Sequence, residues 1–175
     1  MNSLISSLTG STYRNIVKPI FFSFDPESVH DTMVGVGKFM GEIPLARRVT
    51  RSLFAYNHPI LSQTINGITF ENPIGLAAGF DYDANLTQIL GDLGFGFQTV
   101  GTVTQSYYEG NTKPRLGRLP QSRSLLVNKG FKSGGAAAVI DKLRPLSFTH
   151  PVGMSIGSTN TIYAKASGQI DDIMA

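Results

Sequence analysis

The spacing of apolar residues changes near residue 57. Before that point, apolar positions recur at helical intervals, with one set at 16–21 and another at 29–40. Between them, Asp25-Pro26-Glu27 is typical of a helix start, because it supplies an N-cap, a first-turn proline and an acid. We therefore predict a helix that ends near Gly41, and a further short helix over 45–54.

After residue 57, short apolar strands alternate with helices. Asn66-Gly67 accepts the positive φ angles of a type I′ turn, which predicts a β-hairpin over 64–70. We then predict strands at 73–79, 97–103 and 151–157, helices at 86–93, 135–143 and from 162 to the end, and a long connection over 104–132. Such alternation predicts right-handed βαβ units and a parallel α/β sheet. The chain thus divides into a helical extension, 1–57, and an α/β part, 58–175.

The predicted parallel strands all end in small or hydroxyl-bearing residues. These ends are Ala78-Gly79, Gly101-Thr102 and Gly157-Ser158. Small side chains let a ligand approach the backbone closely. In barrels and open α/β sheets, ligands bind at the carboxyl ends of the strands. We call these ends the ligand edge.

Composition narrows the possible chemistry. The 175-residue chain has no cysteine, which excludes disulfides, thiolate metal ligands and a thiol nucleophile within it. Its three histidines lack metal-ligand spacing, so no metal site is predicted. The net charge is only +3, and Lys113, Arg115 and Arg118 are spread along one segment. Nucleic acid is therefore not an expected partner.

The apolar N-terminal segments allow two interpretations. They either cap the core of the α/β part, or they lie in a membrane interface with arginines at the lipid headgroups. No run approaches the roughly 18 apolar residues that span a bilayer, so any attachment is expected to be peripheral. The first 24 residues contain no acid and carry Arg14 and Lys18, which faintly resembles an organelle transit peptide.

Several segments resemble one enzyme family. The segment Asn72-Pro73-Ile74-Gly75-Leu76-Ala77-Ala78-Gly79-Phe80-Asp81 is similar to the first barrel strand of dihydroorotate dehydrogenases. Further pieces follow in the family's order at 94–104, 110–119, 130–131 and 153–157. Upstream, Phe24-Asp25-Pro26-Glu27 with His30 resembles the N-terminal extension of the quinone-dependent class (class 2). Together these pieces cover about residues 13–157.

The resemblance implies a fold and an activity. The fold would be a TIM (β/α)8 barrel, with only the first three or so βα units present, preceded by the helical extension. FMN would bind at the ligand edge, and dihydroorotate would be oxidised to orotate in pyrimidine (UMP) biosynthesis. A quinone would accept the electrons after entering between the N-terminal helices. The expected location is peripheral, at the cytoplasmic side of a bacterial inner membrane or, alternatively, at the mitochondrial inner membrane.

The resemblance also assigns residues. Those expected at the cofactor are Ala78, Gly79, Phe80, Asp81, Tyr82, Thr102 and Ser155. Those expected at the substrate are Tyr82, Asn128, Lys129, Gly130 and Phe131. His30 and Arg118 would lie on the quinone path. The alternatives are structural roles. Gly79 and Gly130 would then be turn glycines, His30 an ordinary interfacial histidine and Arg118 a surface charge. The catalytic base, a serine in this class, is expected beyond Ala175, so an incomplete chain, inactive alone, is predicted.

Three positions depart from the family's pattern. Tyr82 stands where a lysine is usual, and Ser155 stands where an asparagine is usual. Val127 occupies the place of a substrate-binding asparagine, with Asn128 one position later. Lys129 could pair with the orotate carboxylate instead. These departures leave two alternatives: a same-fold FMN oxidoreductase acting on another dihydropyrimidine or enone, or a non-catalytic remnant.

Overall fold

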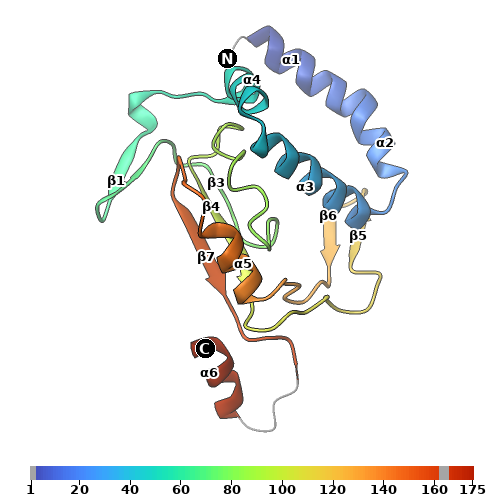
Figure 1. Ribbon diagram of the computed structural model, residues 1–175. Coiled ribbons are helices and arrows are strands. Elements are labelled where there is room, and N and C mark those ends of the chain that lie inside the picture. Colours follow the sequence, from blue (N-terminus) through green and yellow to red (C-terminus); the bar gives the residue numbers. More distant parts are fainter. Residues whose placement is uncertain (1–2, 162–165) are drawn as a thin grey trace.

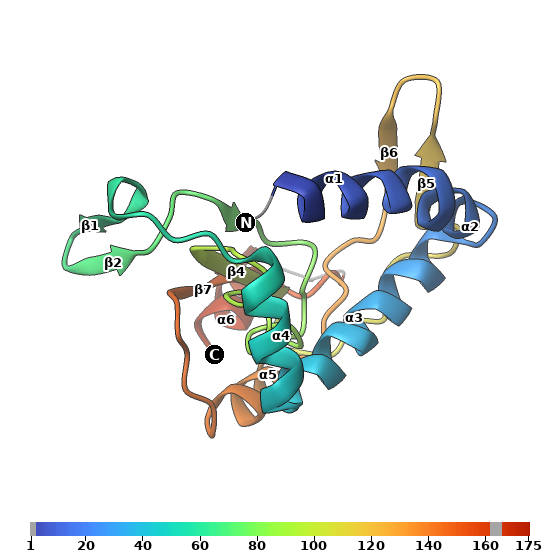
Figure 2. The ribbon, with the colours of Figure 1, turned by 90° about the horizontal axis from the view of Figure 1, so that it is seen from above.

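The computed structural model describes residues 3–161 and 166–175, and it begins with a helical arm (Figure 1). The arm comprises α1 (Ser3–Thr12), the π-helical turn η1 (Tyr13–Val17), α2 (Lys18–Phe22), α3 (Pro26–Glu42) and α4 (Pro44–Phe54). The first three elements form one rod, and α3 turns back from its end to make an open V (Figure 2). The predicted helical character of this extension is confirmed over 3–54, apart from short breaks at 23–25 and 43, whereas 55–57 are not helical.

Local sequence signals explain where α3 begins and how it packs. The Asp25 carboxylate accepts the Ser28 N–H at 2.9 Å, as an N-cap does, and Pro26 opens the first turn. On the other side of the helix, glycines permit close contact with the α/β part. A Cβ atom on Gly37 would lie 2.5 Å from Leu86 Cδ2. Glycine at this position therefore favours close packing of α3 against the turns that contain Leu86.

The α/β part is built on a three-stranded parallel sheet in the order β3-β4-β7 (Figure 1). Its strands are β3 (Gly75–Leu76), β4 (Phe97–Val103) and β7 (Val152–Ile156), with α5 (Ala136–Leu143) between the last two and α6 (Ala166–Met174) after them. Val100 and Val139 belong to one buried apolar cluster, and Leu86, Ile89 and Leu90 form another. The predicted parallel sheet is confirmed.

Two hairpins flank this sheet. The strands β1 (Gln63–Ile65) and β2 (Ile68–Phe70) pair around Asn66 and Gly67, whose φ angles of 52° and 80° confirm the predicted turn. The 3-10 turn η2 (Pro59–Leu61) precedes them. The second hairpin, β5 (Leu116–Leu119) with β6 (Ser124–Val127), lies within the segment expected to be a plain connection.

The prediction of a helix over 86–93 is wrong, because this segment folds as consecutive turns. Hydrogen bonds run both to the third residue back, as from Ile89 N to Leu86 O, and to the fourth, as from Leu90 N. The apolar residues of this segment are buried against α3, so packing alone explains their spacing without a regular helix. Of the strand predicted at 73–79, only β3 is paired, and 162–165 of the last predicted helix lie outside the described residues.

Candidate functional site

The ligand edge consists of bare backbone and two hydroxyl groups. Gly79 N donates to Gly101 O at 2.8 Å, which joins the end of β3 to β4. A Cβ atom on Gly79 would meet no atom within 4 Å, so the space over this glycine is open. The Thr102 and Ser155 hydroxyl oxygens lie 2.9 Å apart across β4 and β7. The structure thus brings three of the residues predicted at the cofactor to one edge, where exposed Ala78 adjoins them.

Asp81 has its side chain in the interior rather than at this edge. Its carboxylate accepts the N–H groups of Asn85 at 2.7 Å and Leu86 at 2.8 Å, and a longer contact from Gln98 Nε2 at 3.4 Å. Burial raises the pKa of Asp81, although the two backbone hydrogen bonds oppose that rise. Its carbonyl oxygen accepts the N–H of Gly101. The residue therefore supports the turns that follow β3.

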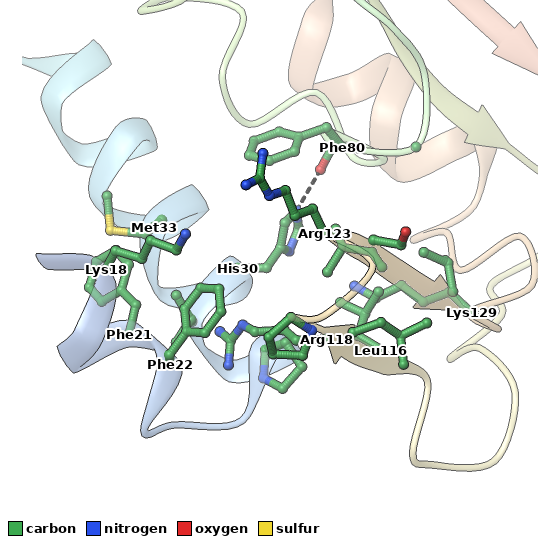
Figure 3. A pocket seen from close by; sticks show the side chains of 18 of the residues that line it. Lys18, Phe21, Phe22, His30, Met33, Phe80, Leu116, Arg118, Arg123 and Lys129 are labelled. Atoms are coloured by element: carbon green, nitrogen blue, oxygen red, sulfur yellow. Dashed lines mark hydrogen bonds between the residues drawn. The ribbon is translucent and has the colours of Figure 1, made fainter. Parts of the chain in front are cut away.

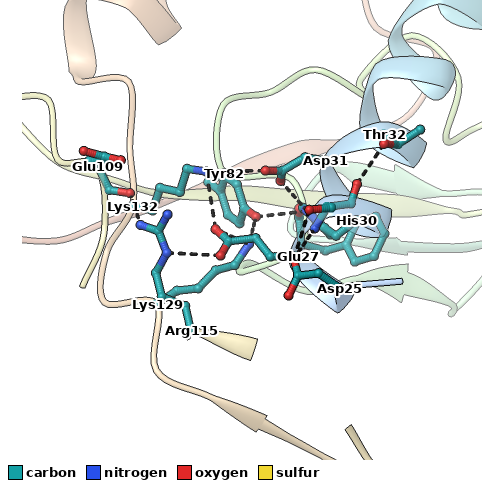
Figure 4. Close-up of polar contacts among 12 residues, drawn as sticks. Asp25, Glu27, His30, Asp31, Thr32, Tyr82, Glu109, Arg115, Lys129 and Lys132 are labelled. Carbon is teal, nitrogen blue, oxygen red and sulfur yellow. Dashed lines mark hydrogen bonds and ion pairs between the residues drawn. The ribbon is translucent and has the colours of Figure 1, made fainter. Parts of the chain in front are cut away.

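Tyr82 points the other way, towards α3 (Figure 4). Its hydroxyl lies 3.0 Å from His30 Nδ1 and accepts a hydrogen bond from Lys129 Nζ. The ammonium of Lys129 lies 4.7 Å from the centre of the tyrosine ring, within cation–π range. The buried tyrosine thus joins the loop after β3, the helix α3 and the segment after β6. Its contact with a cofactor or substrate stays a prediction.

A buried carboxylate organises the cations around Tyr82. Glu27 Oε2 accepts a hydrogen bond from Arg115 Nε at 3.1 Å, while its Oε1 lies 3.8 Å from Lys129 Nζ and 3.7 Å from Lys132 Nζ. Arg115 also donates to the Glu109 carbonyl. From sequence, Glu27 was assigned only a first-turn acid role in α3. The nearby lysines and arginine are far from it in the chain, so no local signal pointed to this cluster.

A cavity of about 710 Å³ lies between the helical arm and the β5–β6 hairpin (Figure 3). We call it the arm cavity. It is mostly apolar and is lined by Tyr13, Lys18, Phe21, Phe22, Pro26, Val29, His30, Met33, Gly79, Phe80, Leu116, Arg118, Leu119, Pro120, Arg123, Ser124, Leu125, Val127 and Lys129. Its inner end reaches Gly79, so it opens towards the ligand edge.

Both residues predicted on the quinone path line this cavity. His30 Nε2 donates to the Phe80 carbonyl at 2.8 Å, which fixes the ring at the inner end. Arg118 Nη1 donates to the Phe24 carbonyl at 2.7 Å, and its guanidinium lies 4.7 Å from the Phe22 ring centre. Arg118 thus fastens the hairpin to the end of α2.

The remaining residues predicted at the substrate surround Gly130. This glycine has a φ angle of 67°, and Phe131 follows it beside Gly157. The Asn128 Oδ1 accepts a hydrogen bond from Asn111 Nδ2 at 3.0 Å. Asn111 in turn contacts Asn160 Nδ2 at 3.1 Å, a residue for which no sequence signal indicated a role. The structure therefore gathers several amide groups here that only the fold brings together.

Parallel strands with open carboxyl ends, next to an apolar cavity under a helical arm, define an α/β protein, and in α/β proteins ligands bind at these strand ends. The family profile described as dihydroorotate dehydrogenase matches residues 60–175, most of the chain. The chain therefore belongs to the dihydroorotate dehydrogenase family.

Similar proteins agree with this assignment. The dihydroorotate dehydrogenase (quinone) of Corynebacterium efficiens is 38% identical over 175 residues, which covers 95% of this chain and 46% of the relative. The enzyme of the same name from Synechococcus sp. is 41% identical over 155 residues, covering 83% of this chain and 40% of the relative. The chain thus spans less than half the length of these relatives.

Solved structures also resemble the chain. The crystal structure of ligand-free DHODH from Eimeria tenella has a TM-score of 0.68 and 32% identity, and the match covers 85% of this chain and 40% of that one. The structure of the same organism's DHODH in complex with ferulenol has a TM-score of 0.69 and 32% identity, with 83% and 39% covered. The partial parallel sheet is therefore a piece of this family's fold.

Proposed function

We propose that this chain supplies the ligand edge and the acceptor cavity of an enzyme that oxidises dihydroorotate to orotate, with FMN as cofactor and a quinone as electron acceptor. The observation that carries the proposal is the arm cavity, because a large apolar hollow runs from the helical arm to the open backbone of Gly79. A flat, apolar quinone needs such a hollow to come close to a cofactor at the strand ends.

The residues at the ligand edge fit a flavin. Gly79 leaves open space over its backbone, and the Thr102 and Ser155 hydroxyls supply hydrogen-bonding groups beside it. When bound, FMN would take an electron pair from the substrate and pass it to the acceptor. The chain's own residues would hold the ring against peptide groups and keep water away on the cavity side.

The same geometry favours one alternative substrate class. The loop after β3 carries Tyr82 where a lysine is usual, so it presents no cation to a substrate at the edge. A same-fold oxidoreductase acting on a dihydropyrimidine without a carboxylate would not need that cation. Parallel assays with dihydroorotate and dihydrouracil separate the two substrates.

The test uses a holoenzyme made by fusing this chain to the remaining part of the Corynebacterium efficiens relative. We expect a yellow protein that reduces a short-chain quinone analogue when given dihydroorotate. A Val29→Trp substitution, which fills the arm cavity, should raise the KM for the quinone by about ten-fold and leave flavin reduction by dihydroorotate unchanged. The exposed Tyr107→Trp is the control. Bound flavin that stays oxidised with dihydroorotate would refute the proposal.

Membrane contact through the helical arm belongs to the same proposal. Apolar side chains such as Ile16, Ile20 and Phe24 are exposed on α1, η1, α2 and the turn that follows, and among the described residues no helix is long and apolar enough to cross a bilayer. We propose peripheral binding at the cytoplasmic side of a bacterial inner membrane, the mitochondrial inner membrane being the alternative. In α4, by contrast, Arg47 and Arg51 pair with Asp92 and are not free for headgroups.

A further inference from the structure

Four side chains connect the inner end of the arm cavity to the solvent (Figure 4). Lys129 lines the cavity and donates to the Tyr82 hydroxyl. That hydroxyl lies 3.0 Å from His30 Nδ1, and Asp31 Oδ1 lies 3.0 Å from the same nitrogen. The Asp31 side chain is 48% exposed, whereas the other three are largely buried. Lys129 and His30 therefore both face the cavity, and Asp31 connects them to water.

Hydrogen-bond chemistry limits where the hydrogens of these side chains can lie. His30 Nε2 faces the Phe80 carbonyl at 2.8 Å, and a carbonyl only accepts, so Nε2 carries a hydrogen. When Nδ1 carries no hydrogen it accepts from the Tyr82 hydroxyl, and when it carries one it donates to the Asp31 carboxylate or to the tyrosine oxygen. The Lys129 ammonium has only donors, so it donates to the tyrosine oxygen. Lys129 Nζ and His30 Nδ1 thus both face the Tyr82 hydroxyl, and Nδ1 has a partner whether or not it carries a hydrogen, as a relay requires.

We infer that Lys129, Tyr82 and His30 form a proton path that serves the electron acceptor in the arm cavity. The inference rests on the proposed function. A quinone becomes a quinol by gaining two electrons and two protons, and dihydroorotate loses the same number when it becomes orotate. At the inner end of the cavity, Lys129 gives one of these protons to a ring oxygen: an N–H bond breaks, an O–H bond forms, and a neutral amine remains. The other proton would come from the reduced cofactor together with the electron pair.

The path then restores the proton on Lys129. The neutral amine takes a proton from the Tyr82 hydroxyl, and the tyrosine oxygen takes one from Nδ1 of a protonated His30. Solvent returns a proton to His30 beside the Asp31 carboxylate, which can accept a hydrogen bond from Nδ1. No group on the path carries an extra charge after a full cycle.

The surroundings suit Tyr82 to a relay role. Burial raises the pKa of its hydroxyl, and the carboxylates of Asp31, Glu27 and Asp83 raise it further, while Arg115 opposes them. The hydroxyl therefore stays protonated at neutral pH and passes protons without becoming a lasting anion. It does not line the cavity itself, so it has no contact with the acceptor.

The surroundings of Lys129 favour proton release. Burial lowers the pKa of its ammonium, and Lys132 and Arg115 lower it too, while Glu27 and Asp31 oppose the change. Lys132 Nζ also lies 3.7 Å from Asp31 Oδ2, which ties the solvent end of the path to the same cluster. A lysine in this setting is a better proton donor than an exposed one.

The first test needs no cofactor. In the 175-residue chain with 15N-labelled histidine, NMR should find His30 mainly with its hydrogen on Nε2. Tyr82→Phe should increase the Nδ1–H tautomer about five-fold, because the donor to Nδ1 is lost and Asp31 can accept that hydrogen instead. The exposed Tyr107→Phe is the matched control. A dominant Nδ1–H tautomer in the wild type would overturn the path.

The second test measures turnover in the holoenzyme described above. Tyr82→Phe should slow the quinone-reducing half-reaction by about 10–100-fold with little change in the quinone KM, because the tyrosine serves proton transfer without touching the acceptor. Lys129→Arg keeps the charge but cannot release a proton, so it should be similarly slow.

The outcomes separate this inference from the function on which it rests. If the wild-type holoenzyme reduces no quinone with dihydroorotate, the proposed function fails and the path fails with it. If the wild type turns over normally and Tyr82→Phe or Lys129→Arg matches its rate, only the path is overturned.

Discussion

Asp81 and Tyr82 are neighbours in the chain, yet their side chains enter two different polar networks. Asp81 contacts Gln98 Nε2, and Gln98 Oε1 lies 3.1 Å from His150 Nε2. Tyr82 joins Lys129 to His30 in the other network. Each network contains an acidic or basic side chain (Asp81 or Lys129), an uncharged polar side chain (Gln98 or Tyr82) and a histidine. They differ in where they end.

The Asp81 network is closed. All three of its side chains are buried, and His150 Nδ1 has no hydrogen-bond partner in the part of the chain that the structure describes. The Tyr82 network runs from a cavity to the exposed Asp31. A buried closed network contributes to stability and holds the turns after β3 in place, whereas an open one can exchange protons with water. Substitutions in the closed network should therefore change stability, whereas substitutions along the open network should change proton transfer.

The largest stability effect is expected at Glu27, the anion beneath the Tyr82 network. Glu27→Gln removes the charge that pairs with Arg115, Lys129 and Lys132 while keeping the shape of the side chain. Leaving the buried Arg115 and Lys129 without this counter-charge should lower the free energy of unfolding by about 3–5 kcal/mol in urea titrations.

The control for Glu27→Gln is an exposed ion pair. Asp141 and Arg144 lie 3.6 Å apart with side chains more than 70% exposed, so Asp141→Asn should cost less than about 0.5 kcal/mol. An equal loss of unfolding free energy in the two variants would mean that burial does not strengthen the contribution of the Glu27 ion pairs to stability.

The next largest effect is expected in the closed network. Gln98→Leu leaves His150 without a hydrogen-bond partner at either ring nitrogen and removes one contact of Asp81. Buried unsatisfied groups should lower the free energy of unfolding by about 1–3 kcal/mol. The variant should leave the His30 tautomer unchanged in NMR spectra. A shift of that tautomer would show that the two networks are coupled.

Local sequence signals predicted many of the helices and strands that surround both networks. Asp25, Pro26 and Asn66-Gly67 are local signals, because each acts on its own turn, and the structure confirms the elements that they begin or join. The helix over 86–93 failed because its apolar spacing serves a packed series of turns equally well. Local patterns specify which residues are buried more firmly than they specify backbone hydrogen bonding.

The candidate site was predictable only where it is built from consecutive residues. Ala78-Gly79 could be recognised as a strand end, and the structure opens that end to the arm cavity. The contact of Tyr82 with Lys129 spans 47 positions, and that of Glu27 with Arg115 spans 88. Long-range pairs of this kind follow from the fold and leave no periodic signal. The sequence itself shows Tyr82 in place of a usual lysine, but it carries no sign of the residues that Tyr82 contacts.

The smallest effect, and the sharpest contrast between the networks, is the pH dependence contributed by His150. Burial lowers the pKa of His150, and Arg47 lowers it further, while Asp92 opposes them. The unfolded chain therefore binds a proton on this residue at a higher pH than the folded chain does. Its contribution to stability is complete above the ordinary pKa of about 6.5 and is lost as the pH falls towards the folded value. The slope contributed by one group is at most about 1.4 kcal/mol per pH unit.

Urea titrations between pH 7 and pH 5 should show that loss in the wild type and a flatter profile in His150→Gln, whose amide can still donate to Gln98. Asp81 titrates with the opposite sign, because burial raises its pKa, so the comparison uses the difference between the two profiles rather than either profile alone. If the profiles were parallel, His150 would take up its proton as readily folded as unfolded. The Asp81 network would then be open to water, and the distinction from the Tyr82 network would be lost.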